Sequence, residues 1–278
     1  MMRELTLASG ASLPVFGVGT WRMGEHDDHF DAEVAVLREA LEQGVRLIDT
    51  AEMYGEGGAE EVIGEAIRGR RDGLYLVSKF YPYNASRRGV VEACERSLRR
   101  MDCDFIDLYL LHWPGSIPLQ ETFDALLSLQ ESGKIRDFGV SNFDLGNLEA
   151  IPTELQARLG CNQVFYNLVH REAEWAVSGW CRERKVPLMA YSPLDQGGAL
   201  LRSPVLEEIA DKHQATPAQI ALAWLLHQPG TVVIPKTSNS RRVAENLGAV
   251  DVVLDAADLE ALDSAFPAPQ SPVRLGMR

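Results

Sequence analysis

Short apolar runs recur about every thirty residues along the chain, and segments with helical spacing separate them. From residue 15 onward the runs are Val15–Gly19, Val45–Ile48, Leu74–Val77, Phe105–Leu111, Ile135–Val140, Cys161–Phe165, Val186–Ala190 and Val232–Ile234. Runs of this length, bounded by polar residues, predict buried strands. Strands that alternate with helices pair in parallel, so the pattern predicts an α/β fold.

The intervening segments carry apolar residues three and four positions apart, as the buried face of a helix requires. Such groups are Val62, Ile63, Ala66 and Ile67, then Val91, Cys94, Leu98 and Met101, then Phe123, Leu126 and Leu127. Residues 203–228 predict two consecutive helices, because Ser203-Pro204 and Thr216-Pro217 each offer a capping hydroxyl followed by proline in the first turn. Gln219 stands where it completes a capping box with the Thr216 hydroxyl.

Eight strand and helix units in a chain of 278 residues match a closed (β/α)8 TIM barrel better than an open doubly wound sheet. We therefore expect one barrel domain over residues 1–278. Before the first barrel strand, apolar residues alternate up to Ser9-Gly10 and Leu13 follows that turn. Residues 3–15 thus predict an N-terminal β-hairpin, which we expect to close one end of the barrel.

The apolar fraction of 46% supports a large buried core, but no apolar run is long enough to cross a bilayer. The longest clear run, Ile220–Leu226, has seven residues, whereas a spanning helix needs about 18. Met1-Met2-Arg3-Glu4 leads into no signal-peptide core, so we expect a cytoplasmic protein without a membrane partner. The net charge is −13 and no basic stripe is visible, which argues against a nucleic-acid partner.

Metal and dinucleotide motifs are weak or incomplete. The four cysteines form no C-x-x-C pair, which predicts reduced, mostly buried thiols. His26 and His29 lie among acids, but without a third convergent ligand a solvated loop is the better interpretation, and we expect no metal. Gly17-Val18-Gly19 begins a G-x-G-x-x-G pattern that Arg22 interrupts, so we infer no Rossmann fold.

Polar residues follow nearly every predicted strand, at the end where barrel enzymes place their chemistry. In chain order they are Thr20, Asp49, Lys79, His112, Ser141-Asn142, Gln163, Tyr191-Ser192 and Lys236-Thr237. Any one of them also fits a cap, a turn or a solvated loop, because polar strand ends are common. The whole set predicts an active site at this end of the barrel.

Four of these side chains, counting Tyr54 near Asp49, suit the reduction of a carbonyl group. That reaction needs a hydride donor and a proton donor, and a tyrosine can supply the proton. Its ordinary pKa of about 10 makes it a slow acid, which an adjacent Lys79 ammonium would improve by favouring the phenolate. Asp49 would hold the lysine, and His112 would donate a hydrogen bond to the substrate oxygen.

The contexts Asp-x4-Tyr, Ser-Lys and Leu-His-Trp, at Asp49, Tyr54, Lys79 and His112, resemble the aldo-keto reductase superfamily over almost the whole chain. The resemblance implies an enzyme, an NADPH-dependent oxidoreductase that reduces aldehydes or ketones and works as a monomer. It makes the four residues the catalytic tetrad, with Tyr54 as the proton donor. The segments Asp49–Tyr54 and Gln163–Arg171 look most like bacterial branches that reduce methylglyoxal and other small aldehydes.

The resemblance also assigns residues to the cofactor NADPH/NADP+. Ser141, Asn142 and Gln163 are implied to hydrogen-bond the nicotinamide carboxamide, because amide side chains pair well with an amide. Tyr191 is implied to stack on the nicotinamide, because an aromatic face packs on a flat ring. The backbone of Tyr191-Ser192-Pro193-Leu194 would run along the pyrophosphate. The adenosine-phosphate segment would be Lys236, Thr237, Ser238, Arg242, Glu245 and Asn246, although the family more often has serine where Thr237 stands.

The implied substrate pocket lies at the mouth of the barrel. Thr20 and Trp21 border this mouth next to the cofactor, and Trp21, His112 and Trp113 are the expected substrate contacts. Tyr81 and Tyr83 are either further walls of the pocket or core aromatics. Two other functions stay open: a Schiff-base aldolase or isomerase that uses Lys79, and a non-catalytic NADPH-binding regulatory subunit.

Overall fold

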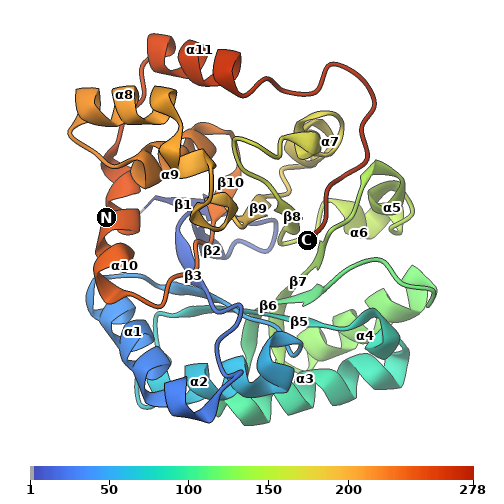
Figure 1. Ribbon diagram of the computed structural model, residues 1–278. Coiled ribbons are helices and arrows are strands. Elements are labelled where there is room, and N and C mark those ends of the chain that lie inside the picture. Colours follow the sequence, from blue (N-terminus) through green and yellow to red (C-terminus); the bar gives the residue numbers. More distant parts are fainter. Residues whose placement is uncertain (1–2) are drawn as a thin grey trace.

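The strands of the computed structural model, which describes residues 3–278, form a parallel sheet that closes into a barrel (Figure 1). They are β3 (Gly17–Gly19), β4 (Leu47–Asp49), β5 (Tyr75–Phe80), β6 (Ile106–Leu111), β7 (Ile135–Ser141), β8 (Asn162–Phe165), β9 (Leu188–Tyr191) and β10 (Thr231–Val233). Neighbours in the sheet follow chain order from β3 to β10. The sheet closes where the Val233 amide donates to the Val15 carbonyl at 2.9 Å and the Gly19 amide to the Pro235 carbonyl at 3.1 Å. The predicted (β/α)8 barrel is confirmed. Met1 and Met2, at the start of the segment that predicts no signal peptide, lie outside the described residues.

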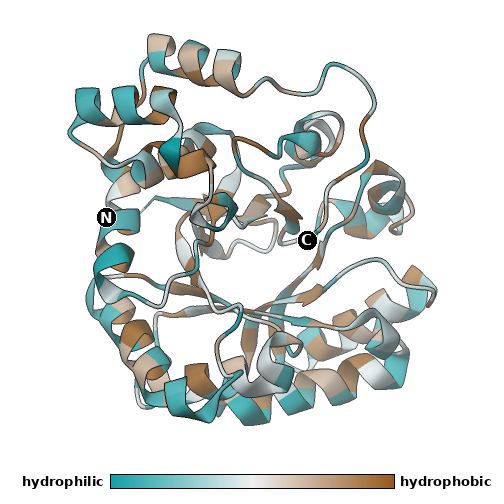
Figure 2. Cartoon of the chain, viewed as in Figure 1, coloured by the Kyte–Doolittle hydropathy of each residue, from teal (hydrophilic) through white to brown (hydrophobic). Residues whose placement is uncertain are grey.

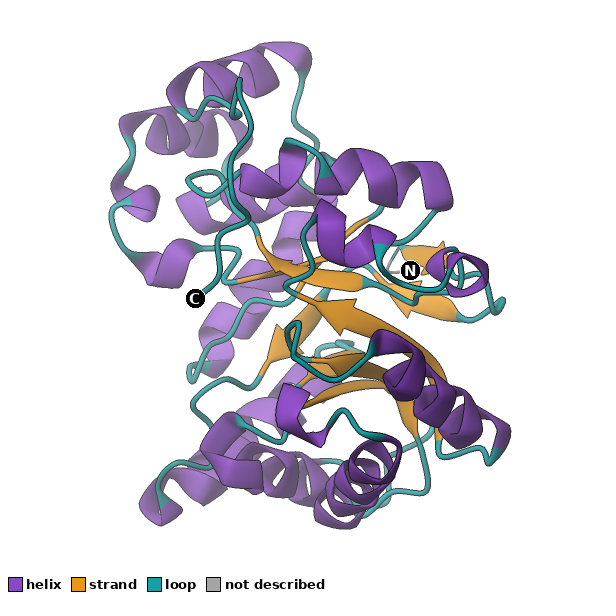
Figure 3. Cartoon of the chain, turned by 90° about the vertical axis from the view of Figure 1, so that its right-hand side faces the viewer, coloured by secondary structure: helices purple, strands orange, loops and turns teal. Residues whose placement is uncertain are grey.

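Helices surround the sheet, as Figures 1 and 3 show from two directions. They are α1 (Phe30–Glu42), α2 (Gly58–Ala66), α3 (Arg87–Met101), α4 (Leu119–Glu131), α5 (Leu145–Glu149), α6 (Thr153–Gln156), α7 (Val177–Arg184), α8 (Pro204–His213), α9 (Pro217–His227), α10 (Ser240–Leu247) and α11 (Ala256–Ala265). Short 3-10 turns are η1 (Asp27–His29), η2 (Tyr54–Gly57), η3 (Pro82–Asn84), η4 (Glu172–Glu174), η5 (Asp195–Gly197), η6 (Leu200–Arg202) and η7 (Gly248–Asp251).

The helices bury most of the apolar positions that the sequence pattern indicates. In α3, Cys94 and Met101 are buried as predicted, whereas Val91 and Leu98 are only partly buried against the core. Val90, which the pattern did not single out, is buried as well, and charged residues of the same helix remain toward solvent. Figure 2 shows the result as helices that carry both hydrophilic and hydrophobic residues. Helix α9 differs, because its run Ile220–Leu226 is buried throughout between other elements. Within residues 3–278, no helix has both the length and the apolar character needed to cross a membrane.

The two predicted helices in residues 203–228 are α8 and α9, but their starts differ. The Thr216 hydroxyl accepts from the Gln219 amide and the Gln219 side chain accepts from the Thr216 amide, so the capping box forms as predicted. Ser203 precedes α8 as expected, yet its hydroxyl caps no amide. The box position of α8 is Leu206, which has no polar group to reach back.

The hairpin closes the amino end of the barrel and leaves the other end for chemistry. Strands β1 (Glu4–Thr6) and β2 (Ser12–Pro14) pair antiparallel with Leu5 opposite Leu13. Leu7 and Leu13 are buried in one apolar cluster with inward-facing residues of the barrel, among them Tyr75 at the start of β5. Gly17 shows how tightly the first strand packs, because a Cβ there would lie 2.0 Å from Leu47 Cδ2. The carboxyl ends of the strands are the open face.

Candidate active site

Asp49, Lys79 and Tyr54 meet at the carboxyl end of the barrel in a buried chain of polar contacts. Asp49 ends β4, Lys79 is the next-to-last residue of β5, and Tyr54 begins η2. The Lys79 Nζ lies 2.9 Å from Asp49 Oδ2, 2.6 Å from the Thr50 carbonyl oxygen and 3.3 Å from the Tyr54 hydroxyl. The side chains of Lys79 and Asp49 are 0% and 3% exposed. The structure therefore brings these predicted residues together in a dry environment.

His112 completes the group of four, which we call the tetrad: Asp49, Tyr54, Lys79 and His112. It follows β6, and its ring meets the Tyr54 ring edge to face with centroids 5.9 Å apart. Its Nδ1 is buried without a hydrogen-bond partner among the described residues. Burial, and then the positive charge of Lys79, hold the pKa of His112 well below its ordinary value. The imidazole is therefore neutral near pH 7 and has one ring N–H to donate.

Burial and the ion pair act in opposite directions on the tetrad. Burial lowers the pKa of Lys79, but the Asp49 carboxylate and the Tyr54 hydroxyl outweigh it, so the pKa lies above its ordinary value. Burial raises the pKa of Tyr54 and Lys79 lowers it, with a net rise. Lys79 thus lowers the pKa of Tyr54, as predicted from the sequence, but burial raises that pKa by more. The phenol keeps its proton at neutral pH and has that proton to give.

Gln163 lies inside its strand and not at the strand end. It is the second residue of β8, two positions before the strand end, and it pairs in register with Ser141 of β7 and Met189 of β9. The stagger of strands in a closed barrel explains the difference, since neighbouring strands reach the same level at different points of their length. The Gln163 Nε2 donates to Asp49 Oδ1 at 2.7 Å.

Two further predicted cofactor residues are held by bonds within the chain. The amide and the hydroxyl of Thr20, which follows β3, both donate to the Asp49 carbonyl at 3.0 Å. The Asn142 Nδ2 donates to the His112 carbonyl at 3.0 Å, and its Oδ1 accepts from the Tyr191 hydroxyl at 2.9 Å. These bonds connect the ends of β3 and β4, and those of β6, β7 and β9, around the tetrad.

The Tyr191 ring and the turn after it form the next side of the site. Tyr191 ends β9, and its ring stacks on Phe165 with centroids 5.6 Å apart and an interplanar angle of 14°. Ser192 follows in the left-handed region with φ 47°, and its carbonyl accepts from Asn167 Nδ2 at 3.0 Å. Pro193 is buried and Leu194 is partly buried. This turn is therefore rigidly held.

The predicted phosphate residues divide into an exposed set and a set that bonds to or packs against the fold. Lys236, Ser238 and Arg242 are exposed along the loop from β10 into α10, where their charges and donors face solvent. Thr237 accepts from the Asn239 amide at 3.1 Å, in the turn that leads to the helix.

Glu245 and Asn246 lie further along α10 and take part in packing. The Glu245 Oε1 accepts from the Thr216 hydroxyl at 2.9 Å, which joins α10 to α9. Asn246 is buried, with 5% of its surface exposed. The structure therefore gives these two residues contacts with the fold, on the inner side of α10.

Aromatic residues form a continuous wall from the tetrad to the surface. The Trp113 ring lies 4.8 Å from the His112 ring and meets Tyr81 edge to face at 5.8 Å. Tyr81 in turn stacks on Tyr83 at 4.5 Å. Tyr83 is 71% exposed, which excludes a place in the core. On the β3 side of the mouth, Trp21 is 36% exposed.

Glu52 anchors this wall, although no sequence pattern singles it out. Its Oε1 accepts from the Tyr81 amide at 2.8 Å and from Asn84 Nδ2 at 2.7 Å, and Oε2 lies 3.2 Å from Arg96. Only 5% of its surface is exposed. An acid in a turn ordinarily indicates a solvated loop, so only the burial shows that it joins two loops of the site.

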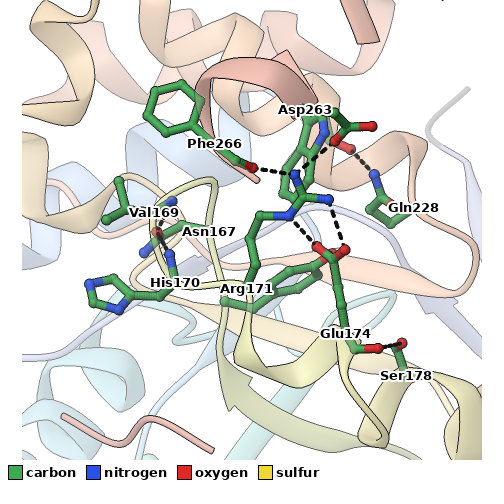
Figure 4. Close-up of polar contacts among 11 residues, drawn as sticks. Asn167, Val169, His170, Arg171, Glu174, Ser178, Gln228, Asp263 and Phe266 are labelled. Carbon is green, nitrogen blue, oxygen red and sulfur yellow. Dashed lines mark hydrogen bonds and ion pairs between the residues drawn. The ribbon is translucent and has the colours of Figure 1, made fainter. Parts of the chain in front are cut away.

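Arg171 joins the loop after β8 to the last helix (Figure 4). Its guanidinium makes two bonds to the Glu174 carboxylate, at 2.7 and 2.8 Å, and one to Asp263 Oδ1 at 2.7 Å. It also donates to the Phe266 carbonyl, at the end of α11. Asn167, in the same loop, accepts from the Val169 and His170 amides at 2.9 Å each. The loop is thus fixed at both ends.

The segment after α11 returns across the barrel to the site, where the C label marks its end near the middle of Figure 1. The Arg278 amide donates to the Tyr191 hydroxyl at 3.1 Å, and its guanidinium donates to Asp195 Oδ1 at 2.7 Å. Gly276 lies close to Phe165, since a Cβ there would be 3.4 Å from the Phe165 ring. The tail therefore covers one side of the mouth.

Within residues 3–278, no three His, Cys, Asp or Glu side chains are arranged to hold a metal ion. His26 and His29 are exposed, with rings 5.5 Å apart.

The Asp49–Lys79 pair generates a stability prediction. Lys79→Met removes the cation from a buried carboxylate, and we expect it to lower the free energy of unfolding by about 3–5 kcal/mol. The double variant Asp49→Leu, Lys79→Met should recover much of that loss, because no uncompensated charge remains. Urea unfolding at neutral pH measures both. A double variant less stable than the single one would contradict this account of the pair.

Comparison with known proteins places the chain in a family. The model of the Aldo/keto reductase family matches residues 15–266. The methylglyoxal reductase YeaE of Escherichia coli (strain K12) is 44% identical over 284 aligned positions, which cover 100% of both chains. The glyoxal reductase of Bacillus subtilis (strain 168) is 34% identical and covers 93% of this chain and 91% of its own.

Solved structures agree with the sequence comparison. An aldo-keto reductase from Klebsiella pneumoniae in complex with NADPH has 42% identity and a TM-score of 0.95 over 100% of both chains. An aldo/keto reductase from Klebsiella pneumoniae in complex with NADP and acetate has 43% identity and a TM-score of 0.96 over the same share. The barrel, the order of the tetrad along its strands and these full-length matches confirm the prediction: the chain belongs to the aldo/keto reductase family and is an NADP-dependent oxidoreductase.

Proposed function

We propose that this enzyme reduces small aldehydes, methylglyoxal among them, to alcohols, with Tyr54 as the proton donor. The observation that carries the proposal is the 3.3 Å contact between the Tyr54 hydroxyl and the Lys79 Nζ inside a water-excluded site. NADPH is the cofactor of this enzyme and supplies the hydride when bound. We infer that residues 1–278 act as one barrel domain in doing so.

The tetrad supplies the proton side of the reaction. His112 is neutral, and its ring N–H holds the substrate oxygen beside Tyr54. The Tyr54 hydroxyl gives its proton to that oxygen as negative charge develops there. The Lys79 ammonium stabilises the phenolate that remains, and Asp49 keeps the lysine charged and in place. Each of the four side chains thus has a distinct role.

The residues around the tetrad fit the cofactor. Ser141, Asn142 and Gln163 present hydroxyl and amide groups that would hold the nicotinamide carboxamide, and the Tyr191 ring offers a flat face. Ser192, Pro193 and Leu194 would follow the pyrophosphate. Exposed Lys236, Ser238 and Arg242 provide the charges and donors that a 2′-phosphate requires. The remaining predicted residues, Thr20, Trp21, Thr237, Glu245 and Asn246, would shape the edges of this site.

Small aldehydes are the substrate class that the site favours. Trp21, His112 and Trp113 would contact the substrate, and Trp113 is backed by Tyr81. Glu52 accepts a hydrogen bond from the Tyr81 amide, so the aromatic wall does not move easily to make room for a bulky ketone. An aldehyde carbon is also less crowded for hydride attack. The methylglyoxal reductase and glyoxal reductase named above act on such compounds, at 44% and 34% identity to this chain.

The two other functions that the sequence left open have less support. A Schiff base requires a neutral lysine amine, but Lys79 has a raised pKa and donates to three acceptors. A non-catalytic role would not require the buried tetrad, whose ion pair is costly to maintain.

We also propose that the enzyme is a cytoplasmic monomer without a nucleic-acid partner. Its four cysteines are free and mostly buried, as suits a reducing compartment. Its net charge of −13 opposes binding to a phosphate backbone.

Tyr54→Phe tests the proton donor directly. We expect kcat for aldehyde reduction to fall roughly 100- to 10,000-fold, while NADPH binding by fluorescence quenching stays close to wild type, because only one hydroxyl is lost. Tyr109→Phe is the matched control, since Tyr109 is a core residue whose hydroxyl has no partner among the described residues. A Tyr54→Phe enzyme that keeps most of its turnover would sink the assignment.

A substrate panel tests the proposed class. With purified enzyme and saturating NADPH, kcat/KM for methylglyoxal and other short aldehydes should exceed the values for steroids and long-chain ketones. A bulky ketone with the highest kcat/KM would show that the aromatic wall is wrongly interpreted as a restriction on size.

Arg242→Ala tests the phosphate site. A charge-assisted contact is worth about 1.5–3 kcal/mol, so the Kd of NADPH should rise roughly 10- to 100-fold while that of NADH stays unchanged. Arg241→Ala is the neighbouring exposed control and should affect neither nucleotide much. The measurements need fixed ionic strength, because salt screens such contacts. Equal weakening of NADPH and NADH would assign Arg242 to the fold or the adenine instead.

A further inference from the structure

Gln163 makes a contact that recognition of a cofactor does not require. Its side chain is 1% exposed in the barrel interior, and its Nε2 donates to Asp49 Oδ1 at 2.7 Å. The same nitrogen lies 3.0 Å from Met189 Sδ, a weak acceptor. The amide is therefore directed at the carboxylate of the tetrad.

We propose that Gln163 is a positioning residue for the proton donor, which holds the Asp49 carboxylate in the orientation and charge state that Lys79 and Tyr54 need. The proposal rests on the function proposed above. It adds a fifth residue to the reaction, one that acts through Asp49 and not on the substrate.

The geometry forms one chain of bonds from strand to strand. Gln163 of β8 holds Oδ1 of Asp49 at 2.7 Å, and Lys79 of β5 holds Oδ2 at 2.9 Å. Lys79 then contacts the Tyr54 hydroxyl at 3.3 Å. Because each oxygen of the Asp49 carboxylate is bonded to a different partner, the carboxylate cannot rotate without breaking a hydrogen bond. Loss of Gln163 would leave Oδ1 as a buried acceptor with no donor, which is unfavourable in a dry site.

The same amide has an atom left for the cofactor. Both contacts of Gln163 use Nε2, so Oε1 remains available to accept from an amide such as the nicotinamide carboxamide. Hydrogen bonds at the two ends of one amide strengthen each other. Gln163 thereby links the occupied cofactor site to the Asp49–Lys79 pair.

The charges around Asp49 determine the expected pH effect. Lys79, Tyr54 and the Cys161 thiol face it, together with the neutral Gln163 amide. Burial raises the pKa of Asp49, while Lys79 and Gln163 lower it. Removing the Gln163 donor therefore raises that pKa further. Because the ionised carboxylate is the form that holds Lys79, activity should begin to fail at a higher pH as the solution is made acidic.

The free energy of unfolding of the protein without cofactor provides a second measurement, because its dependence on pH should also change in a defined direction. The Gln163 bond is stronger to the ionised form of Asp49 than to the protonated form. At acidic pH, where Asp49 is protonated in wild type and variant alike, the loss of the bond therefore costs less than at neutral pH. The deficit then grows as the pH rises through the titration of Asp49. A side chain that only fills space would give a deficit that does not change with pH.

The test compares Gln163→Met, which has a similar length and no N–H, with Ser141→Ala. Ser141 belongs to the same proposed nicotinamide contacts, but within residues 3–278 its hydroxyl accepts from Asn142 Nδ2 alone. Both variants should weaken NADPH binding in fluorescence quenching. Ser141→Ala is the reference for the pH dependence alone. Gln163→Met should lower kcat at saturating NADPH, roughly tenfold at neutral pH. Only this variant should move the acidic limb of kcat to higher pH and show the pH-dependent deficit in urea unfolding.

Gln163→Glu covers the case in which Gln163→Met does not fold. It keeps Oε1 and the shape, and it replaces the donor with a second carboxyl group beside Asp49. A proton shared by the two carboxyl groups restores the donor and keeps one negative charge beside Lys79 to lower pH, so the acidic limb should move in the opposite direction, to lower pH. A pH profile and a pH-independent stability deficit like those of Ser141→Ala would overturn the proposal. A wild-type enzyme that fails to oxidise NADPH with any aldehyde would instead refute the proposed function.

Discussion

The buried ion pair between Asp49 and Lys79 is the interaction on which the rest of the site depends. Two charges removed from water are costly unless each finds partners of good geometry. Here Lys79 donates to the Asp49 carboxylate, the Thr50 carbonyl and the Tyr54 hydroxyl, while Gln163 donates to the second oxygen of the carboxylate. The pair therefore persists in a dry interior, where its field on Tyr54 is strong.

The barrel is what makes this pair possible. Parallel strands deliver their last residues to one face, so residues separated along the chain by 30 and 114 positions meet at Asp49. The hairpin closes the opposite end with Leu7 and Leu13, which leaves a single open face. Loops after the strands are then held from outside, by Glu52 under the aromatic wall and by Arg171 at the last helix. Rigid loops around the rigid Asp49–Lys79 pair leave the bound substrate few possible orientations.

Much of this could be predicted from the sequence, for reasons that also explain what could not. The strands were located to within a few residues because their apolar runs are short and evenly spaced. The tetrad followed from strand-end polarity and from a family resemblance. The level of Gln163 in the barrel depends on stagger, which no local pattern records. The contact of Arg278 with Asp195 joins residues 83 apart, and the net rise in the pKa of Tyr54 comes from burial. Such effects belong to the folded chain alone.

The protonation state of Lys79 is the most direct test of the central claim. Protein labelled with 15N-lysine allows the Nζ signal of Lys79 to be assigned against Lys79→Met and followed with pH by NMR. The account predicts an ammonium signal through neutral pH and past the ordinary value of 10.5, because Asp49 and Tyr54 outweigh burial. In Asp49→Asn the same signal should titrate at lower pH. A neutral Lys79 amine at pH 7 in the wild-type enzyme would contradict the account.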